Sequence, residues 1–114
     1  MTVDLFAGVP VSDYEAAVDW FERLLGQPAS FQPHDTESVW ILAENRSVYV
    51  VLAAERAGGG LVTVMIDDLD SFMAAAEARG VKPGTVEDYG DGVRKAVYRD
   101  LDGNEIGVGE APST

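Results

Sequence analysis

Few side chains in this chain have the types and spacing that catalysis needs. His34 is the only histidine, cysteine is absent, and Asp100, Asp102 and Glu105 flank a Gly-Asn turn. Without cysteine there is no thiolate nucleophile and no sulfur ligand, and His34 has no serine partner for a triad. The acids could attract Ca²⁺, but aspartates beside Gly-Asn typically form turns. General acid–base chemistry by Glu105 with a tyrosine remains conceivable, provided that the pKa of its carboxyl is raised.

The composition narrows the class of partner. The 114 residues include 20 acidic and 8 basic ones, for a net charge of −12, and 46% are apolar. Such a charge repels nucleic acid and anionic membranes and favours cationic partners. The apolar fraction predicts one folded domain. No apolar run approaches the roughly 20 residues that span a bilayer, and the N-terminus lacks the pattern of a signal peptide. We therefore expect a cytoplasmic protein with no membrane partner.

Apolar periodicity predicts two helices among eight strands. Ser12 and Glu15 have the spacing of a capping box at the start of the first helix, and Gly26 ends it. Asp68 precedes the second helix, which ends at Gly80. Alternation and turn residues predict strands over residues 3–11, 29–34, 38–43, 47–53, 61–66, 85–89, 93–100 and 105–110.

The second half of the chain repeats the first. When Asp13 is superposed on Asp68, Phe6 falls on Leu61, and a glycine-rich segment at residues 58–60 lies between the copies. That segment lacks the Lys-Ser/Thr of a phosphate-binding loop. We predict an α+β fold in which two βαβββ modules form curved sheets around a cleft. In each module the helix covers one sheet face and leaves the other bare. The modules of this single domain span residues 1–57 and 58–114.

These elements resemble the vicinal oxygen chelate superfamily, which includes glyoxalase I, extradiol dioxygenases and the fosfomycin- and bleomycin-resistance proteins. The likeness covers essentially the whole chain, and the order and distances of four segments carry it. They are Val-Ser-Asp at 11–13 before a helix that ends in Leu-Leu-Gly at 24–26, Asp-Asp-Leu-Asp at 67–70, and the Asp-Leu-Asp-Gly-Asn turn at 100–104 before Glu-Ile-Gly-Val at 105–108.

The resemblance also implies where a metal would bind. Metal-dependent members carry a histidine in the first strand of each module and a glutamate in the last strand, positions that fall here on Phe6, Leu61 and Gly107. Some members add a glutamate from the fourth strand, which falls near Tyr49 or Val51. A catalytic metal needs about three imidazole or carboxylate ligands, and the first three positions supply none. We therefore expect neither a metal nor another cofactor.

The positions that remain predict an apolar, aromatic cleft. Gly107 and Gly109 would leave room for a bulky guest, and Trp40 and Tyr98 are the expected stacking residues. Glu105 would pair with a cationic ligand. Aromatic strand residues also pack in cores, so a filled core between the sheets is the alternative. The predicted ligand-binding residues are Phe6, Trp40, Tyr49, Leu61, Met65, Tyr98, Glu105 and Gly107.

The main functional hypothesis is a non-enzymatic protein that, like the bleomycin-resistance proteins, sequesters an aromatic or cationic small molecule. The resemblance implies a homodimer. Two alternatives stay open: a metal-independent lyase or isomerase of the same fold, and a structural dimer with a filled core. The sequence does not name the ligand, and it does not tell whether modules pair within one chain or across two.

Overall fold

A computed structural model describes residues 1–112 of the chain. Its strands agree with the predicted ones to within two residues at each end. No helix in the described residues is both long enough and apolar enough to cross a membrane. The elements are β1 (Leu5–Val11), α1 (Tyr14–Leu25), β2 (Phe31–His34), β3 (Glu37–Ala43), β4 (Arg46–Leu52), the short 3₁₀ helix η1 (Ala54–Arg56), β5 (Leu61–Ile66), α2 (Leu69–Ala78), β6 (Thr85–Gly90), β7 (Val93–Arg99) and β8 (Glu105–Glu110).

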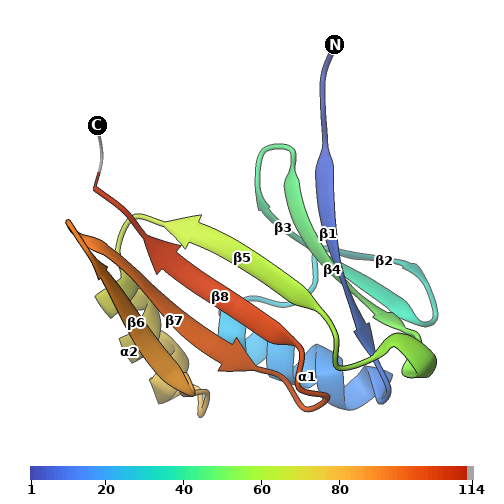
Figure 1. The fold of residues 1–114 in the computed structure, drawn as a ribbon. Helices are drawn as coiled ribbons and strands as arrows, with labels where there is room; N and C mark the ends of the chain where they lie inside the picture. The colour runs from blue at the N-terminus through green and yellow to red at the C-terminus, as the bar shows by residue number, and fades with distance from the viewer. Residues whose placement is uncertain (113–114) are drawn as a thin grey trace.

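The strands form two sheets of four, one from each half of the chain. Their orders are β1-β4-β3-β2 and β5-β8-β7-β6, with one parallel pair in each, β1 with β4 and β5 with β8. The predicted α+β fold of two βαβββ units is confirmed. Figure 1 shows two curved sheets that do not close into a barrel, with α1 below their junction and α2 behind β6 and β7.

The first helix begins one residue later than the capping box predicts. Asp13 is the N-cap, since its Oδ1 accepts a hydrogen bond from the Ala16 amide at 3.2 Å. Ser12 is not the cap, and its amide donates to Asp102 of the second half at 3.0 Å. The predicted end is confirmed: Gly26 has a φ of 77°, in the left-handed region that glycine tolerates.

The second helix begins at the predicted cap. Asp68 accepts a hydrogen bond from the Ser71 amide at 3.0 Å, and this bond lowers the pKa of the Asp68 carboxyl. Glu110, at the end of β8, accepts from the Leu69 amide at 2.8 Å and from Arg94 at 2.7 Å. These bonds lower the pKa of Glu110, the Leu69 amide most strongly. The start of α2 is thereby fixed to the end of its sheet.

The hydrophobic core lies between the helices and the sheet faces that they cover. Its fully buried members come from both helices and from strands of both sheets, so the two halves share one core. The largest of these side chains are Trp40, Tyr98, Phe21, Leu24, Leu69, Val9, Val11, Val50 and Val108.

A buried asparagine joins the two halves. Asn104 is fully buried, and its Oδ1 accepts hydrogen bonds from the amides of Gly58 at 3.0 Å and Gly60 at 2.7 Å. Its Nδ2 donates to the Pro10 carbonyl and to Asp100 Oδ2, both at 2.8 Å. All four polar valences are used. This Asn104 hub fixes β1, the glycine segment and the β7–β8 turn relative to one another.

Candidate ligand-binding faces of the two sheets

The bare face of the first sheet is aromatic. Phe6 on β1 is 48% exposed, and Phe31 and Ile41 on β2 and β3 are exposed as well. Tyr49 lies over Gly8, because a Cβ built at Gly8 would stand 2.5 Å from the Tyr49 Cζ. A side chain at position 8 would displace the Tyr49 ring from its place over β1. The face presents rings and branched apolar groups.

The pairing of the strands settles the register of β4. Gly8 pairs with Tyr49, and Thr63, its counterpart in the second half, pairs with Gly107. Tyr49 is therefore the structural equivalent of Gly107. Of the two candidates for the fourth-strand position, Tyr49 occupies it, and Val51 lies two residues further along the strand.

The bare face of the second sheet is less open than the glycines suggested. Leu61 is 72% and Met65 57% exposed. A Cβ at Gly107 would meet the Lys95 Cδ at 3.0 Å, and one at Gly109 would meet the Met65 Sδ at 2.9 Å. Neighbouring side chains thus already lie over both glycines. The expectation that the glycines leave room for a bulky guest is corrected accordingly.

The charged groups on this face are paired with one another. Glu105 lies 3.2 Å from Arg99, and Glu87 lies 3.8 Å from Lys95. The Tyr89 hydroxyl also donates to Glu87, and this hydrogen bond raises the pKa of Tyr89. Glu105 is on the expected face, but Arg99 already balances its charge. A cationic ligand would have to compete with that guanidinium.

Trp40 and Tyr98 do not lie on the bare faces. Both are fully buried on the helix-covered side, where Trp40 donates from Nε1 to the Gln27 carbonyl at 3.1 Å. The Tyr98 ring meets Phe72 of α2 edge-on at 6.0 Å. Its hydroxyl has no hydrogen-bond partner in the described part of the chain, and burial raises its pKa. Strand alternation points both rings away from the bare faces, which corrects their expected stacking role.

A groove of about 450 Å³ separates the two halves. Most of its apolar lining comes from the helix-facing side of the strands, although the bare-face residues Ser47, Thr63 and Met65 also reach it. The bare faces therefore do not face each other across this groove. Its apolar lining residues include Leu5, Ala7, Leu42, Val48, Val62, Val64, Met65 and Ile66.

The donor set does not fit the metal of the metal-dependent relatives. The four equivalent positions carry Phe6, Tyr49, Leu61 and Gly107, which offer neither imidazole nor carboxylate. Across residues 1–112, no three histidine or acidic side chains gather closely enough to hold a metal ion. These positions therefore lack the ligands that a catalytic metal needs.

The other polar residues that stand out in the sequence have structural surroundings. His34 is exposed and lies 3.3 Å from Glu37. Asp100 Oδ1 accepts from the amides of Asp102 and Asn104 at 3.0 and 2.8 Å, so the predicted turn-forming role of this aspartate is confirmed.

The bare-face residues that escaped the sequence reasoning include Phe31, Ile41 and Lys95. Lys95 precedes the buried Ala96, and Ile41 follows the buried Trp40. Alternation from a core residue would have assigned both to the bare face. The sequence alone does not show which of two neighbouring strand residues is buried. Alternation therefore assigns a face only once the register of the strands is known.

Comparisons with known proteins agree with this geometry. A search of curated proteins gave no significant match. The crystal structure of a glyoxalase/bleomycin resistance protein from Catenulispora acidiphila is 46% identical, with a TM-score of 0.95, over 97% of this chain and all of the other. TnmS3, an antibiotic-binding protein from Streptomyces, is 24% identical with a TM-score of 0.73 over 98% of both chains. A bleomycin-binding protein complexed with bleomycin is 16% identical with a TM-score of 0.75 over 97% of this chain and all of the other.

A lactoylglutathione lyase and two oxidases share the fold as well. At such low identity, likeness to these enzymes and to the two antibiotic binders speaks for the fold alone. The family match is more specific, because the Glyoxalase/Bleomycin resistance protein/Dioxygenase superfamily matches residues 3–108. The chain therefore belongs to this superfamily.

Proposed function

We propose that this protein binds a small, largely planar and apolar molecule without a metal, on the bare faces of its sheets, and does so as a homodimer. The proposal rests on the residue types at the four positions that are equivalent to the metal-ligand positions of metal-dependent members. They hold Phe6, Tyr49, Leu61 and Gly107, at the positions where the resemblance to metal-dependent members implies metal ligands. Rings and aliphatic groups there favour contact with an apolar guest.

The exposed apolar side chains on the bare faces support the proposal that a second copy of the chain covers them. Leu61, Met65 and Phe6 are all about half exposed or more in one chain. Burying such a side chain contributes roughly 1.5–3 kcal/mol, and contiguous exposed apolar surface typically marks an interface or a binding site. A bare face from a second chain would cover these residues and enclose a cleft between two sheets.

The charges on the second face bear on the character of the ligand. Glu105 with Arg99, and Glu87 with Lys95, form two balanced pairs. Affinity would come mainly from stacking on Tyr49 and from apolar burial. Relatives named as antibiotic-binding and bleomycin-binding proteins support a small-molecule guest, and bleomycin is therefore a suitable first probe.

The dimer is tested with two aspartate variants of matched exposure. Leu61 lies on the bare face and Leu101 in the β7–β8 turn, 72% and 65% exposed respectively. Sedimentation equilibrium should show a dimer for the wild type and for Leu101→Asp, and a monomer for Leu61→Asp. A wild-type monomer, or equal behaviour of the two variants, would remove the dimer from the proposal.

Binding is tested by calorimetric titration with bleomycin and a set of planar aromatic compounds. Tyr49→Leu should weaken the affinity for any binder about tenfold, the magnitude of one lost aromatic contact. Leu101→Ala serves as the control and should leave the affinity unchanged. A stoichiometric transition metal in the purified protein would contradict the proposal. Chemical conversion of a bound compound would favour a metal-independent lyase or isomerase.

A further inference from the structure

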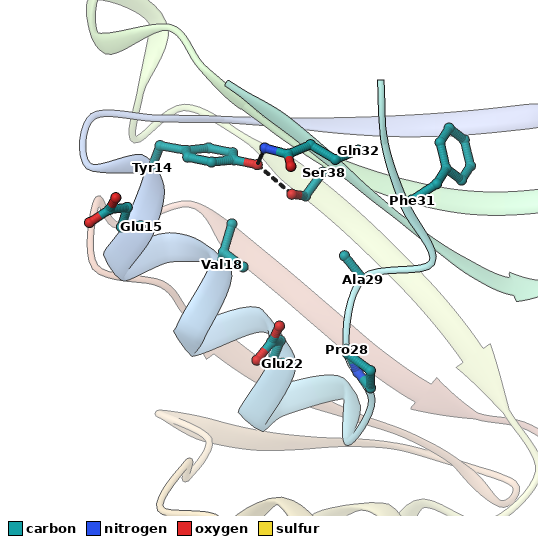
Figure 2. A pocket seen from close by; sticks show the side chains of 9 residues that line it. All are labelled: Tyr14, Glu15, Val18, Glu22, Pro28, Ala29, Phe31, Gln32 and Ser38. Carbon is teal, nitrogen blue, oxygen red and sulfur yellow. Dashed lines mark hydrogen bonds between the residues drawn. The ribbon is translucent and has the colours of Figure 1, made fainter. Parts of the chain in front are cut away.

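A second hollow lies on the outside of the first half, away from the bare faces. It has a volume of about 500 Å³ and opens between α1 and the segment that leads into β2. Figure 2 shows Val18 on the helix opposite Pro28 and Ala29, which together make an apolar lining, while the Phe31 ring points away from the space. We refer to this hollow as the α1–β2 groove.

One end of the groove is closed by a satisfied polar cluster. The hydroxyls of Tyr14 and Ser38 share a hydrogen bond, and Gln32 donates to the Tyr14 hydroxyl at 3.0 Å. Ser38 is buried, so this end is held in place by the sheet as well as by the helix. The cluster fixes the distance between α1 and β2, and with it the width of the groove.

Two carboxylates of the groove have no partner. Glu15 and Glu22 both line it, and because they are seven residues apart they lie on the same side of α1. Neither forms an ion pair with any group in residues 1–112, whereas their neighbour Asp19 pairs with Arg23 at 3.0 Å. The groove therefore combines an apolar lining with uncompensated negative charge.

The end of α1 does not add to this charge. Glu22 lies in the last turn of the helix, and its carbonyl accepts the Gly26 amide. Free carbonyls at a helix C-terminus create a negative potential, but the Arg79 guanidinium already donates to the carbonyls of Arg23 and Leu24, at 2.6 and 3.3 Å. The charge available to a ligand in the groove is therefore that of the Glu15 and Glu22 carboxylates.

We propose that the α1–β2 groove binds a small organic cation. Its ammonium group lies against Glu22, and its apolar body lies on Val18 and Ala29. The site is independent of the proposed binding on the bare faces, because α1 covers the opposite face of the first sheet. One chain therefore has room for two different ligands at the same time.

The test is a titration followed through backbone amide signals in ¹H–¹⁵N NMR spectra. The probe is benzylammonium, compared with benzyl alcohol and benzoate, which have the same ring and a neutral or negative group. Benzylammonium should shift the amides of residues 15–22 and 29–32 in a saturable way, and the other two compounds should not. Equal binding of benzyl alcohol, or saturable shifts confined to other residues, would overturn the proposal.

Charge variants separate a local contact from the general field of an acidic protein. Glu22→Gln should weaken benzylammonium binding about threefold to fivefold, the effect of one partly exposed ion pair. Glu44→Gln changes the net charge equally in the exposed β3–β4 turn and should leave the affinity unchanged. Val18→Phe should weaken binding by filling the groove. An equal loss in Glu22→Gln and Glu44→Gln would reduce the effect to long-range attraction and refute the site.

Discussion

Replacing Asn104 by alanine tests how strongly the buried hub stabilises the fold; one of its four hydrogen bonds, to Pro10, reaches the first half. The side chain makes four hydrogen bonds, to Gly58, Gly60, Pro10 and Asp100, at 2.7 to 3.0 Å. Asn104→Ala removes all four at once. It leaves two amides, a carbonyl and a carboxylate oxygen without a protein partner.

The size of the effect follows from that count. A typical hydrogen bond contributes about 0.5–1.5 kcal/mol net, and a buried group that loses its partner costs more. Four bonds give about 2–6 kcal/mol. Because Gly58 and Gly60 are only partly buried, water can replace some of the lost bonds, and we expect a loss of about 3 kcal/mol. For a domain of this size that corresponds to a fall in Tm of about 10 °C.

Urea denaturation followed by circular dichroism measures the loss of unfolding free energy. Ser12→Ala is the control, because it removes the hydroxyl that donates to Asp102, a bond between the halves that is exposed to solvent. The control should lose less than about 1 kcal/mol. If Asn104→Ala stays within 1 kcal/mol of the wild type, the hub does not stabilise the fold and the reasoning fails.

Two further predictions concern pH. Burial raises the pKa of Tyr98 above its ordinary value of 10.0, so the folded state favours the neutral phenol and stability falls as the pH rises past that value. Tyr98→Phe should reduce this loss of stability at alkaline pH. Because it removes an unpaired buried hydroxyl, it should also raise the unfolding free energy at pH 7 by about 1 kcal/mol. A clear loss of stability at pH 7 in urea titrations would contradict the prediction. Glu110 has a pKa lowered by the Leu69 amide and by Arg94, so its contribution is present above its ordinary value of 4.5 and disappears as the pH falls through the lowered one. Glu110→Gln should therefore be less stable than the wild type at pH 7, and the difference in Tm should narrow as the pH falls below 4.5. A difference that does not narrow would show that the carboxylate is not the stabilising form.

The elements could be predicted because their signals are local. Alternation and turn residues gave β5 and β8 with correct bounds, and Gly26 ended α1 as expected. The start of α1 could not be read in the same way. The Ser12 hydroxyl donates instead to Asp102, which lies 90 residues away in the sequence, and Asp13 caps the helix. A local motif yields where a distant partner competes for the same side chain.

The candidate site was predictable only where the family positions fixed the face. Phe6, Leu61 and Met65 lie on bare faces as expected. Trp40 and Tyr98 were chosen for their aromatic type, and the pairing of their strands places them in the core. Which side of a strand is buried depends on its neighbours in the sheet, and a single sequence does not contain that register.

The arrangement of the strands also has a consequence for folding kinetics. Every strand pair joins strands of the same half, so each sheet can form without the other. Contacts between distant residues form late because closing a long loop costs entropy first. The bond from Asn104 to Pro10, residues 94 apart, is the kind that forms last. Loosening the join between the halves is therefore expected to speed unfolding far more than it slows folding, so the hub governs how long the native state lasts.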